Sequence, residues 1–166
     1  MNLTKLFETQ RKFRERVNYQ GSDRFEKLIL ALLVELGECA NEWRGFKFWS
    51  KNQEPRTKVQ DPHAYPIVNK NPLLEEYVDG LHFVLELGIE LNQQPSKVQS
   101  FCYENVLKQF NGLYWAVNIL ETKDEFDWVL RKYLGLGEML GFTWEEIEQA
   151  YYEKNKVNHQ RQEEGY

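Results

Sequence analysis

The segment from about Arg24 to Arg44 constrains the fold most, because it is apolar on nearly every side of a helix and still carries carboxylates. On a helical wheel of about 100° per residue, Glu35, Glu38 and Glu42 continue an apolar stripe. The other faces are apolar as well, with Ile29, Leu30, Leu33, Val34 and Leu36. Two acids at this spacing are commonly part of a solvated surface. A helix that is apolar nearly all round, however, is usually buried, and a buried carboxylate needs a partner.

A second acidic stripe lies in the segment from about Asn71 to Asn92. Its acids and its histidine gather on one side of the expected helix: Glu75, Glu76, Asp79, His82, Glu86 and Glu90. No Lys or Arg occurs from Asn71 to Ser96, whereas solvated acidic helices normally carry basic partners. Two interpretations stay open: an amphipathic helix with an acidic outer face, or facing acidic helices that hold Mg²⁺ or Mn²⁺ through oxygen ligands. His82 fits a metal ligand, a substrate contact or a core histidine.

Helical periodicity extends over most of the chain, and no alternating stretch is strong enough to predict a strand. We expect a single all-α domain over residues 1–166, a bundle of about six helices with a metal site between the two acidic helices. The helices are expected at about 3–17, 24–44, 72–92, 96–120, 122–140 and from 144 toward the C-terminus. Asn71-Pro72 gives one of them a cap and a first-turn proline, and Thr143 with Glu146 gives another a capping box.

The region from about Trp49 to Asn71 reads as a long loop, because it holds Pro55, Pro62 and Pro66. Long irregular loops in compact domains tend to be functional or mobile. Just before it, the sequence WRGFKFWSKN interleaves aromatic and basic residues. Such a pattern suits a nucleotide, whose base stacks on rings and whose phosphates meet cations. The alternative is that the rings close one end of the bundle while the cations stay solvated.

The C-terminal segment YYEKNKVNHQRQEEGY carries a further basic face. If the last helix continues through it, Lys154, Asn158 and Arg161 lie on one side and can grip a polyphosphate. The alternative is a frayed polar tail.

Composition narrows the class of protein. The net charge of −5 and pI near 5.4 disfavour a general DNA- or RNA-binding protein. Cys39 and Cys102 lie in apolar stretches, and we expect both to be buried, reduced thiols. The N-terminus lacks the apolar region of a signal peptide, and the apolar run from Leu28 to Val34 is too short to cross a membrane. A cytoplasmic protein is therefore expected.

Three motifs of this chain, in the order in which they occur, resemble motifs of the dimeric all-α dUTP diphosphatases. These enzymes are relatives of the MazG-type nucleoside triphosphate pyrophosphatases. The motifs are ExxE, then ExxD followed by GLHF, then K-N-x-x-N-x-x-R-Q-x-x-G-Y, and the resemblance runs from the TQRKF segment to the final GY. It implies that Glu35, Glu38, Glu76 and Asp79 hold two or three Mg²⁺ ions. It also implies that Glu35 is the catalytic residue that orients the attacking water.

The resemblance implies substrate contacts as well: Gln10, Trp49, His82, Lys154, Asn158 and Arg161. Trp49 would lie near the uracil and His82 against the deoxyribose. The implied reaction converts dUTP and water to dUMP and pyrophosphate, which limits uracil in DNA and supplies dUMP, in a homodimer. Thirty-seven residues separate Glu38 from Glu76, which favours this branch over the compact MazG-type enzymes. A related pyrophosphatase with another base preference, such as dCTP, stays open.

Two other classes of protein also fit acidic helices. A di-iron carboxylate bundle usually needs two Glu-x-x-His pairs, and here only Asp79 and His82 come close. A non-enzymatic interaction module with an acidic helical face would explain the missing lysines, but it would not explain acids inside an apolar stripe.

Overall fold

The structure, a computed structural model, describes residues 2–60 and 69–165. Six helices make up most of these residues. They are α1 (Thr4–Val17), α2 (Arg24–Trp43), α3 (Pro72–Glu90), α4 (Val106–Asn118), α5 (Lys123–Met139) and α6 (Trp144–Glu163). The prediction of an all-α fold is thus confirmed. The sixth helix continues to Glu163, so the interpretation of the C-terminal segment as a frayed tail is wrong for these residues. No helix in the described ranges is both long and apolar enough to span a membrane.

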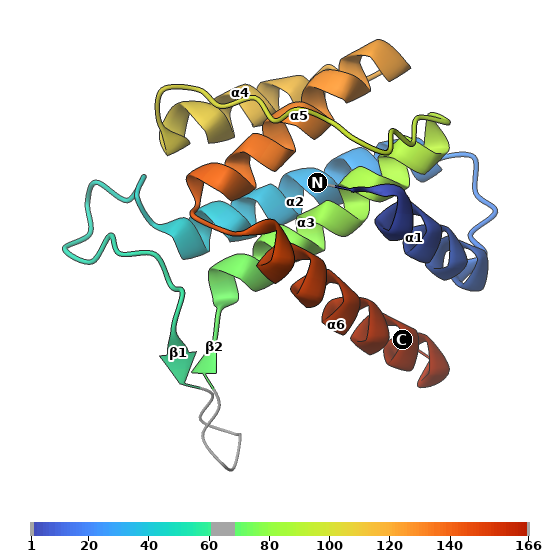
Figure 1. The fold of residues 1–166 in the computed structure, drawn as a ribbon, viewed down its shortest axis with the longest axis horizontal. Helices are drawn as coiled ribbons and strands as arrows, with labels where there is room; N and C mark the ends of the chain where they lie inside the picture. Colours follow the sequence, from blue (N-terminus) through green and yellow to red (C-terminus); the bar gives the residue numbers. More distant parts are fainter. Residues whose placement is uncertain (1, 61–68, 166) are drawn as a thin grey trace.

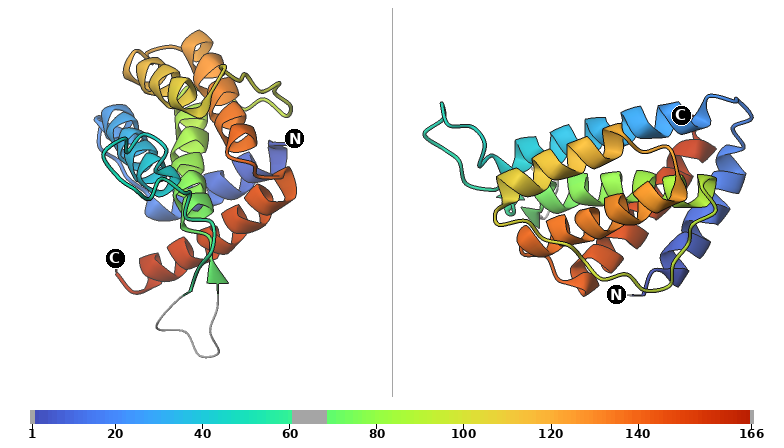
Figure 2. Two further views of the ribbon diagram at one scale, coloured as in Figure 1. Left: turned by 90° about the vertical axis from the view of Figure 1, so that its left-hand side faces the viewer. Right: turned by 90° about the horizontal axis from the view of Figure 1, so that it is seen from above.

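Helix α3 forms the centre of the bundle (Figure 1). It lies antiparallel beside α2, with α4 and α5 over one side of this pair and α1 and α6 over the other (Figures 1 and 2). Its buried residues therefore point in several directions and include Tyr77, Leu81, Val84 and Leu85. The interpretation of this helix as amphipathic with an acidic outer face is wrong, because neighbouring helices cover most of its surface.

The predicted helix starts are confirmed where capping residues mark them. The Asn71 side chain accepts a hydrogen bond from the backbone N–H of Leu74 at 3.1 Å, and Pro72 occupies the first turn of α3. In α6, the Thr143 hydroxyl oxygen accepts from the Glu146 N–H at 3.2 Å, while the Glu146 carboxylate accepts from the Thr143 N–H at 2.8 Å. Short polar side chains at these positions satisfy backbone donors that the helix leaves unpaired.

The expected helix from residue 96 is wrong in its first ten residues, because α4 begins at Val106. Asn105 caps it, its side chain accepting from the Lys108 N–H at 2.9 Å. The preceding segment is held instead by tertiary hydrogen bonds. The Phe101 N–H donates to the Arg131 carbonyl at 2.9 Å, and the buried Gln109 side chain accepts from the Tyr103 N–H at 2.7 Å. Backbone groups that find partners in α4 and α5 do not need a helix of their own.

Two smaller expectations are also corrected. Two-residue strands, β1 (Val59–Gln60) and β2 (Asn69–Lys70), pair antiparallel inside the proposed loop. Pro62, Pro66 and His63 lie outside the described residues. Both cysteines are free, but only Cys39 is buried; Cys102 is exposed, because its segment runs over the surface of α5.

Helix α2 is not buried all round. Leu30 is 65% exposed and Val34 is 49% exposed, on the side away from α3. The opposite side, with Leu28, Leu32, Leu36 and Cys39, packs in the core. The acids of α2 lie at the edge of this buried side: Glu35 and Glu42 are partly buried, whereas Glu38 is exposed.

Candidate active site

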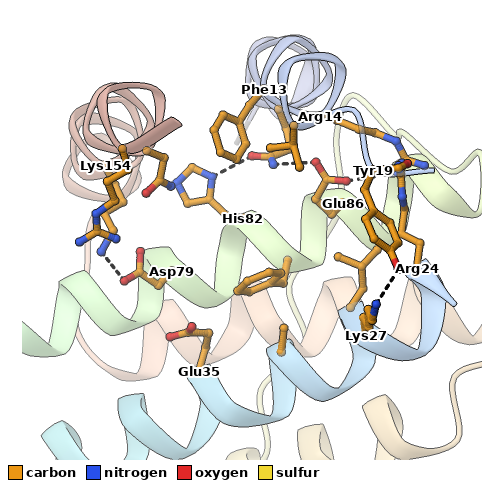
Figure 3. Close-up of a pocket in the computed structure, with 17 residues that line it drawn as sticks. Phe13, Arg14, Tyr19, Arg24, Lys27, Glu35, Asp79, His82, Glu86 and Lys154 are labelled. Carbon is orange, nitrogen blue, oxygen red and sulfur yellow. Dashed lines mark hydrogen bonds and ion pairs between the residues drawn. The ribbon is translucent and has the colours of Figure 1, made fainter. Parts of the chain in front are cut away.

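A cavity of about 510 Å³ opens between α1, α2, α3 and α6 (Figure 3). Its lining includes seven of the ten predicted site residues: Gln10, Glu35, Asp79, His82, Lys154, Asn158 and Arg161. The remaining predicted residues, Glu38, Glu76 and Trp49, do not line it. Residues from the two ends of the sequence thus meet at one place because α1 and α6 lie on the same side of the central pair.

Three carboxylates from α2 and α3 form a tight cluster. Ligand oxygens of Glu35, Glu38 and Glu76 lie within 4.8 Å of one another. Burial, helped by the negative charges of Asp79 and Glu38, raises the pKa of Glu35 to about 7. Burial and the charges of Asp79, Glu38 and Glu35 raise the pKa of Glu76 to about 7 as well. Like charges held this close repel one another, so the cluster is poised for a cation.

Asp79 is placed next to the cluster but is already paired. Lys154 Nζ of α6 lies 2.5 Å from Asp79 Oδ2 (Figure 3). Burial raises the Asp79 pKa, and the hydrogen bond and charge of Lys154 oppose that rise. Arg161, one of the cavity residues, adds a further opposing charge. The predicted basic face of the last helix therefore meets the acids of α3 at the cavity.

A buried hydrogen-bond network fixes the opposite part of the cavity. Gln10 Oε1 accepts from the Tyr151 hydroxyl at 2.7 Å and lies 2.8 Å from His82 Nδ1. Gln10 Nε2 donates to Glu86 Oε1 at 2.8 Å. Because the amide nitrogen is committed to Glu86, the amide oxygen faces His82, and His82 carries its proton on Nδ1. Gln10 is thus a buried connector, and its side chain holds the imidazole in place.

His82 is neutral in this setting. Its ring stacks on Tyr151 with centroids 4.3 Å apart, and burial lowers its pKa to about 3. Its Nδ1 is engaged by Gln10, and it lies outside the carboxylate cluster that the described residues form. The Nε2 atom has no hydrogen-bond partner among those residues. This placement favours a substrate contact over a metal ligand, and it gives no support to a di-iron centre.

Three other acids of the two stripes, Glu42, Glu86 and Glu90, have basic partners that a single helix could not reveal. Arg14 of α1 pairs with Glu86 at 3.2 Å and also with Glu90. Arg56 pairs with Glu42 at 3.3 Å. The missing basic residues of α3 are therefore supplied by α1 and α6. Of the acids in the two stripes, Glu35, Glu38 and Glu76 are the ones whose carboxylates lie close together.

Trp49 lies in the segment after α2 and is 65% exposed. Its ring contacts Phe48 and Phe46 edge to face, with centroids 5.0 and 5.7 Å apart. Trp43, by contrast, packs on Phe110 of α4 at 5.5 Å. The aromatic run thus divides: Trp43 closes the end of the bundle, while Trp49 projects from it.

Several cavity residues were not predicted from the sequence: Phe13 and Arg14 on α1, Tyr19 between α1 and α2, and Arg24 and Lys27 at the start of α2. Phe13 and Arg14 follow Gln10 by three and four positions, and so share its face of the helix. Arg24 and Lys27 extend the stripe of Leu28, Ala31 and Glu35 toward the N-terminus of α2. Continuing both stripes by one turn would have found these four. Nothing in the local pattern marks Tyr19.

The fold and the site together define an all-α protein with a carboxylate cluster beside a cavity that has basic residues in its wall, a combination suited to a phosphorylated substrate. The sequence model of the family described as dUTPase matches residues 2–166, so the chain belongs to the dUTPase family. This confirms the resemblance to the dUTPase family that the motifs indicated, and it implies dUTP as the substrate. No curated protein matches the chain.

Proposed function

We propose that this protein hydrolyses dUTP to dUMP and pyrophosphate at the cavity between α1, α2, α3 and α6. One observation supports this most: Glu35, Glu38 and Glu76 cluster within 4.8 Å, and Glu35 also lines a cavity that Lys154 and Arg161 enter from α6. Acids for a cation and bases for phosphates are both needed to hold a nucleoside triphosphate. Family membership supplies the nucleotide.

The donor set fits Mg²⁺, with Mn²⁺ as a substitute. All the candidate ligands are carboxylates, which hard divalent cations prefer. Lys154 is the one described basic residue whose charge lowers the pKa of Glu35, and no described basic residue is among the causes of the Glu76 shift. We propose that Glu35, Glu38, Glu76 and Asp79 hold two or three such ions together with the phosphates. When bound, the metal supplies neutralisation of the triphosphate and activation of the attacking water.

Glu35 is the proposed catalytic residue. It belongs to both the cluster and the cavity lining, so its carboxylate can accept a hydrogen bond from a water beside the bound phosphates. As a carboxylate, it takes up the proton that this water releases on attack. The oxygen of that water bonds to phosphorus, the phosphoanhydride bond between the α- and β-phosphates breaks, and pyrophosphate leaves with the bonding electrons. Lys154 and Arg161 offset the charge that develops there.

We propose that the neutral His82 contacts the sugar, while the buried Gln10 holds its imidazole in position. His82 Nε2 can only accept a hydrogen bond, because the proton is on Nδ1. The partner that such an acceptor requires is a donor, and the deoxyribose hydroxyl is one. Asn158 lies on the same cavity wall as Lys154 and Arg161 and can contact the base or the phosphates.

A homodimer in the cytoplasm completes the proposal. Leu30 and Val34 form an exposed apolar strip on α2, which burial against a second copy would remove from water. Trp49 is outside the cavity of its own chain, so its proposed contact with uracil requires either movement of its segment or a neighbouring copy. Sedimentation at several protein concentrations tests the dimer.

The deciding experiment measures pyrophosphate release with Mg²⁺ from dUTP, dCTP, dTTP and ATP side by side. A strong preference for dUTP would support both the reaction and the base. Similar turnover of several nucleotides would keep the chemistry but assign a broader pyrophosphatase. Absence of turnover with all four would contradict the proposal and favour an acidic interaction module.

A further inference from the structure

A second cavity, of about 520 Å³, lies on the part of the bundle formed by α4 and α5. It shares no lining residue with the candidate active site. Its walls are mostly aromatic and come from the extended segment before α4 (Phe101, Tyr103), from α4 (Trp115) and from α5 (Trp128). The volume falls in the range of about 300–1,000 Å³ that is typical of small-molecule sites.

One buried cation lines this cavity. Lys132 of α5 is only 5% exposed. Its Nζ lies 5.8 Å from the ring centroid of Tyr103 and 5.6 Å from each of the centroids of Trp115 and Trp128. Among the described residues, this nitrogen has neither an ion-pair partner nor a hydrogen-bond acceptor. Three ring faces pack around this mostly buried side chain, while the ammonium itself stays open to the cavity with its hydrogen-bond donors unused.

The other charged groups beside the cavity are already engaged. The Glu125 carboxylate accepts from the backbone N–H groups of Glu121 and Thr122, at 2.8 and 2.9 Å, at the start of α5. Arg131 stacks over Trp128 at 5.0 Å and pairs with Asp127 at 3.8 Å. The cavity therefore presents an aromatic wall in which backbone donors hold the Glu125 carboxylate and the Lys132 ammonium has no partner among the described residues.

The walls are held in place by close packing. The Gln109 side chain donates to the carbonyls of Phe101 and Lys132 at 2.9 and 2.7 Å, which ties the extended segment to α5. A Cβ atom at Gly112 would lie 2.4 Å from the Tyr103 ring, so only glycine lets that ring rest on α4. A Cβ atom at Gly135 would lie 2.0 Å from the Phe101 carbonyl oxygen. The cavity is thus a preformed feature of the fold.

We propose that this cavity binds a small aromatic carboxylate, whose ring lies among Tyr103, Trp115 and Trp128 and whose anionic group meets Lys132. We choose an anionic ligand because of charge complementarity, since a neutral aromatic molecule would fill the apolar space and still leave the ammonium unpaired. A polyphosphate would need more than one cation and backbone donors, which this wall does not offer.

The test compares naphthoate with naphthylmethanol, an uncharged molecule of similar shape, by isothermal titration of the full-length protein. We expect wild-type protein to bind naphthoate at least about tenfold more tightly, as a charge-assisted hydrogen bond provides. Lys132→Met should lose this preference and keep its affinity for naphthylmethanol. Trp115→Ala, at a residue that is 62% exposed and so tolerant of truncation, should weaken both probes.

Unchanged dUTP turnover and thermal midpoint would confirm that each variant is folded. Equal affinity for the two probes in the wild type, or a preference that survives Lys132→Met, would overturn the proposal. Absence of binding by either probe would overturn it too. If Trp115→Ala then also dissociated an oligomer, the aromatic wall would belong to a subunit interface instead.

Discussion

Lys154 of α6 donates to the Asp79 carboxylate of α3, and this ion pair joins the basic C-terminal helix to the acidic central helix. Both side chains are mostly buried, with 24% and 19% of their surface exposed. The pair lies at the boundary between the carboxylate cluster and the cavity. It therefore holds the proposed phosphate-binding face of α6 directly beside the proposed metal ligands.

Lys154→Met should lower kcat/KM for dUTP by roughly tenfold to a hundredfold, the value of one charge-assisted hydrogen bond. The reason is twofold: the substrate loses a cation, and Asp79 loses its counter-charge. Steady-state kinetics measure the effect. Lys156→Met is the matched control, because Lys156 is exposed on the same helix and does not line the cavity. Equal losses in the two variants would contradict a specific role for Lys154.

Glu38→Gln should abolish turnover, with a loss of at least about a hundredfold, and should leave the fold intact. Glu38 is exposed and its removal relieves repulsion in the cluster, so the midpoint of thermal unfolding without metal should hold or rise. Pyrophosphate release and circular dichroism measure the two effects. Glu75→Gln, at an exposed acid of α3 outside the cluster, should behave as wild type. Near-normal activity of Glu38→Gln would mean that the metal site is misassigned.

The carboxylate cluster should also make stability depend on pH. Glu35 and Glu76 have pKa values raised from 4.5 to about 7, so the folded state holds protons that the unfolded state has lost between these values. Without metal, their contribution to stability falls as pH rises through this window and then stays low. His82, with its pKa lowered to about 3, contributes in the opposite sense, so the cluster must be isolated by a variant.

Glu76→Gln isolates it. In EDTA, the variant should be more stable than wild type by roughly 1 kcal/mol near pH 8, since both carboxylates stay partly exposed and water screens their repulsion. The difference should shrink near about pH 5, where the wild-type cluster is protonated. Mg²⁺ should stabilise the wild type more at the higher pH, because protons compete with metal for the same oxygens. Thermal melts at both pH values measure this; a difference independent of pH would exclude the proposed coupling.

The salt bridge between Arg14 and Glu86 should be structural. Glu86 is buried, and Arg14→Met removes its ion-pair partner and leaves only the charge of Arg24 nearby, which should cost about 2–4 kcal/mol in urea unfolding. Glu86→Gln in the Arg14→Met background should recover much of that loss, because a neutral amide needs no counter-charge. Arg11→Met on the exposed side of α1 is the control. Absence of recovery in the double variant would show that packing of Arg14 matters more than its charge.

Much of this protein could be predicted from local sequence. Asn71-Pro72 and the Thr143–Glu146 capping box fix helix starts through neighbouring backbone groups alone. The motif order identified the dUTPase family, and it assigned Lys154, Asn158 and Arg161 to one face because a helix repeats every 3.6 residues. These features depend on interactions over a few neighbouring residues, so they can be predicted without knowing how the helices pack.

Other features depend on contacts between helices that are far apart in the chain. The segment before Val106 is extended because its backbone hydrogen-bonds to Gln109 of α4 and to Arg131 of α5. Local helix propensity does not take such partners into account. The acids of α3 were sorted in the same way: Arg14 neutralises Glu86, Lys154 neutralises Asp79, and Glu76 joins the cluster with Glu35 and Glu38. Whether a carboxylate is a structural partner or a candidate ligand depends on which charges other helices bring within a few ångströms. Packing sets those distances.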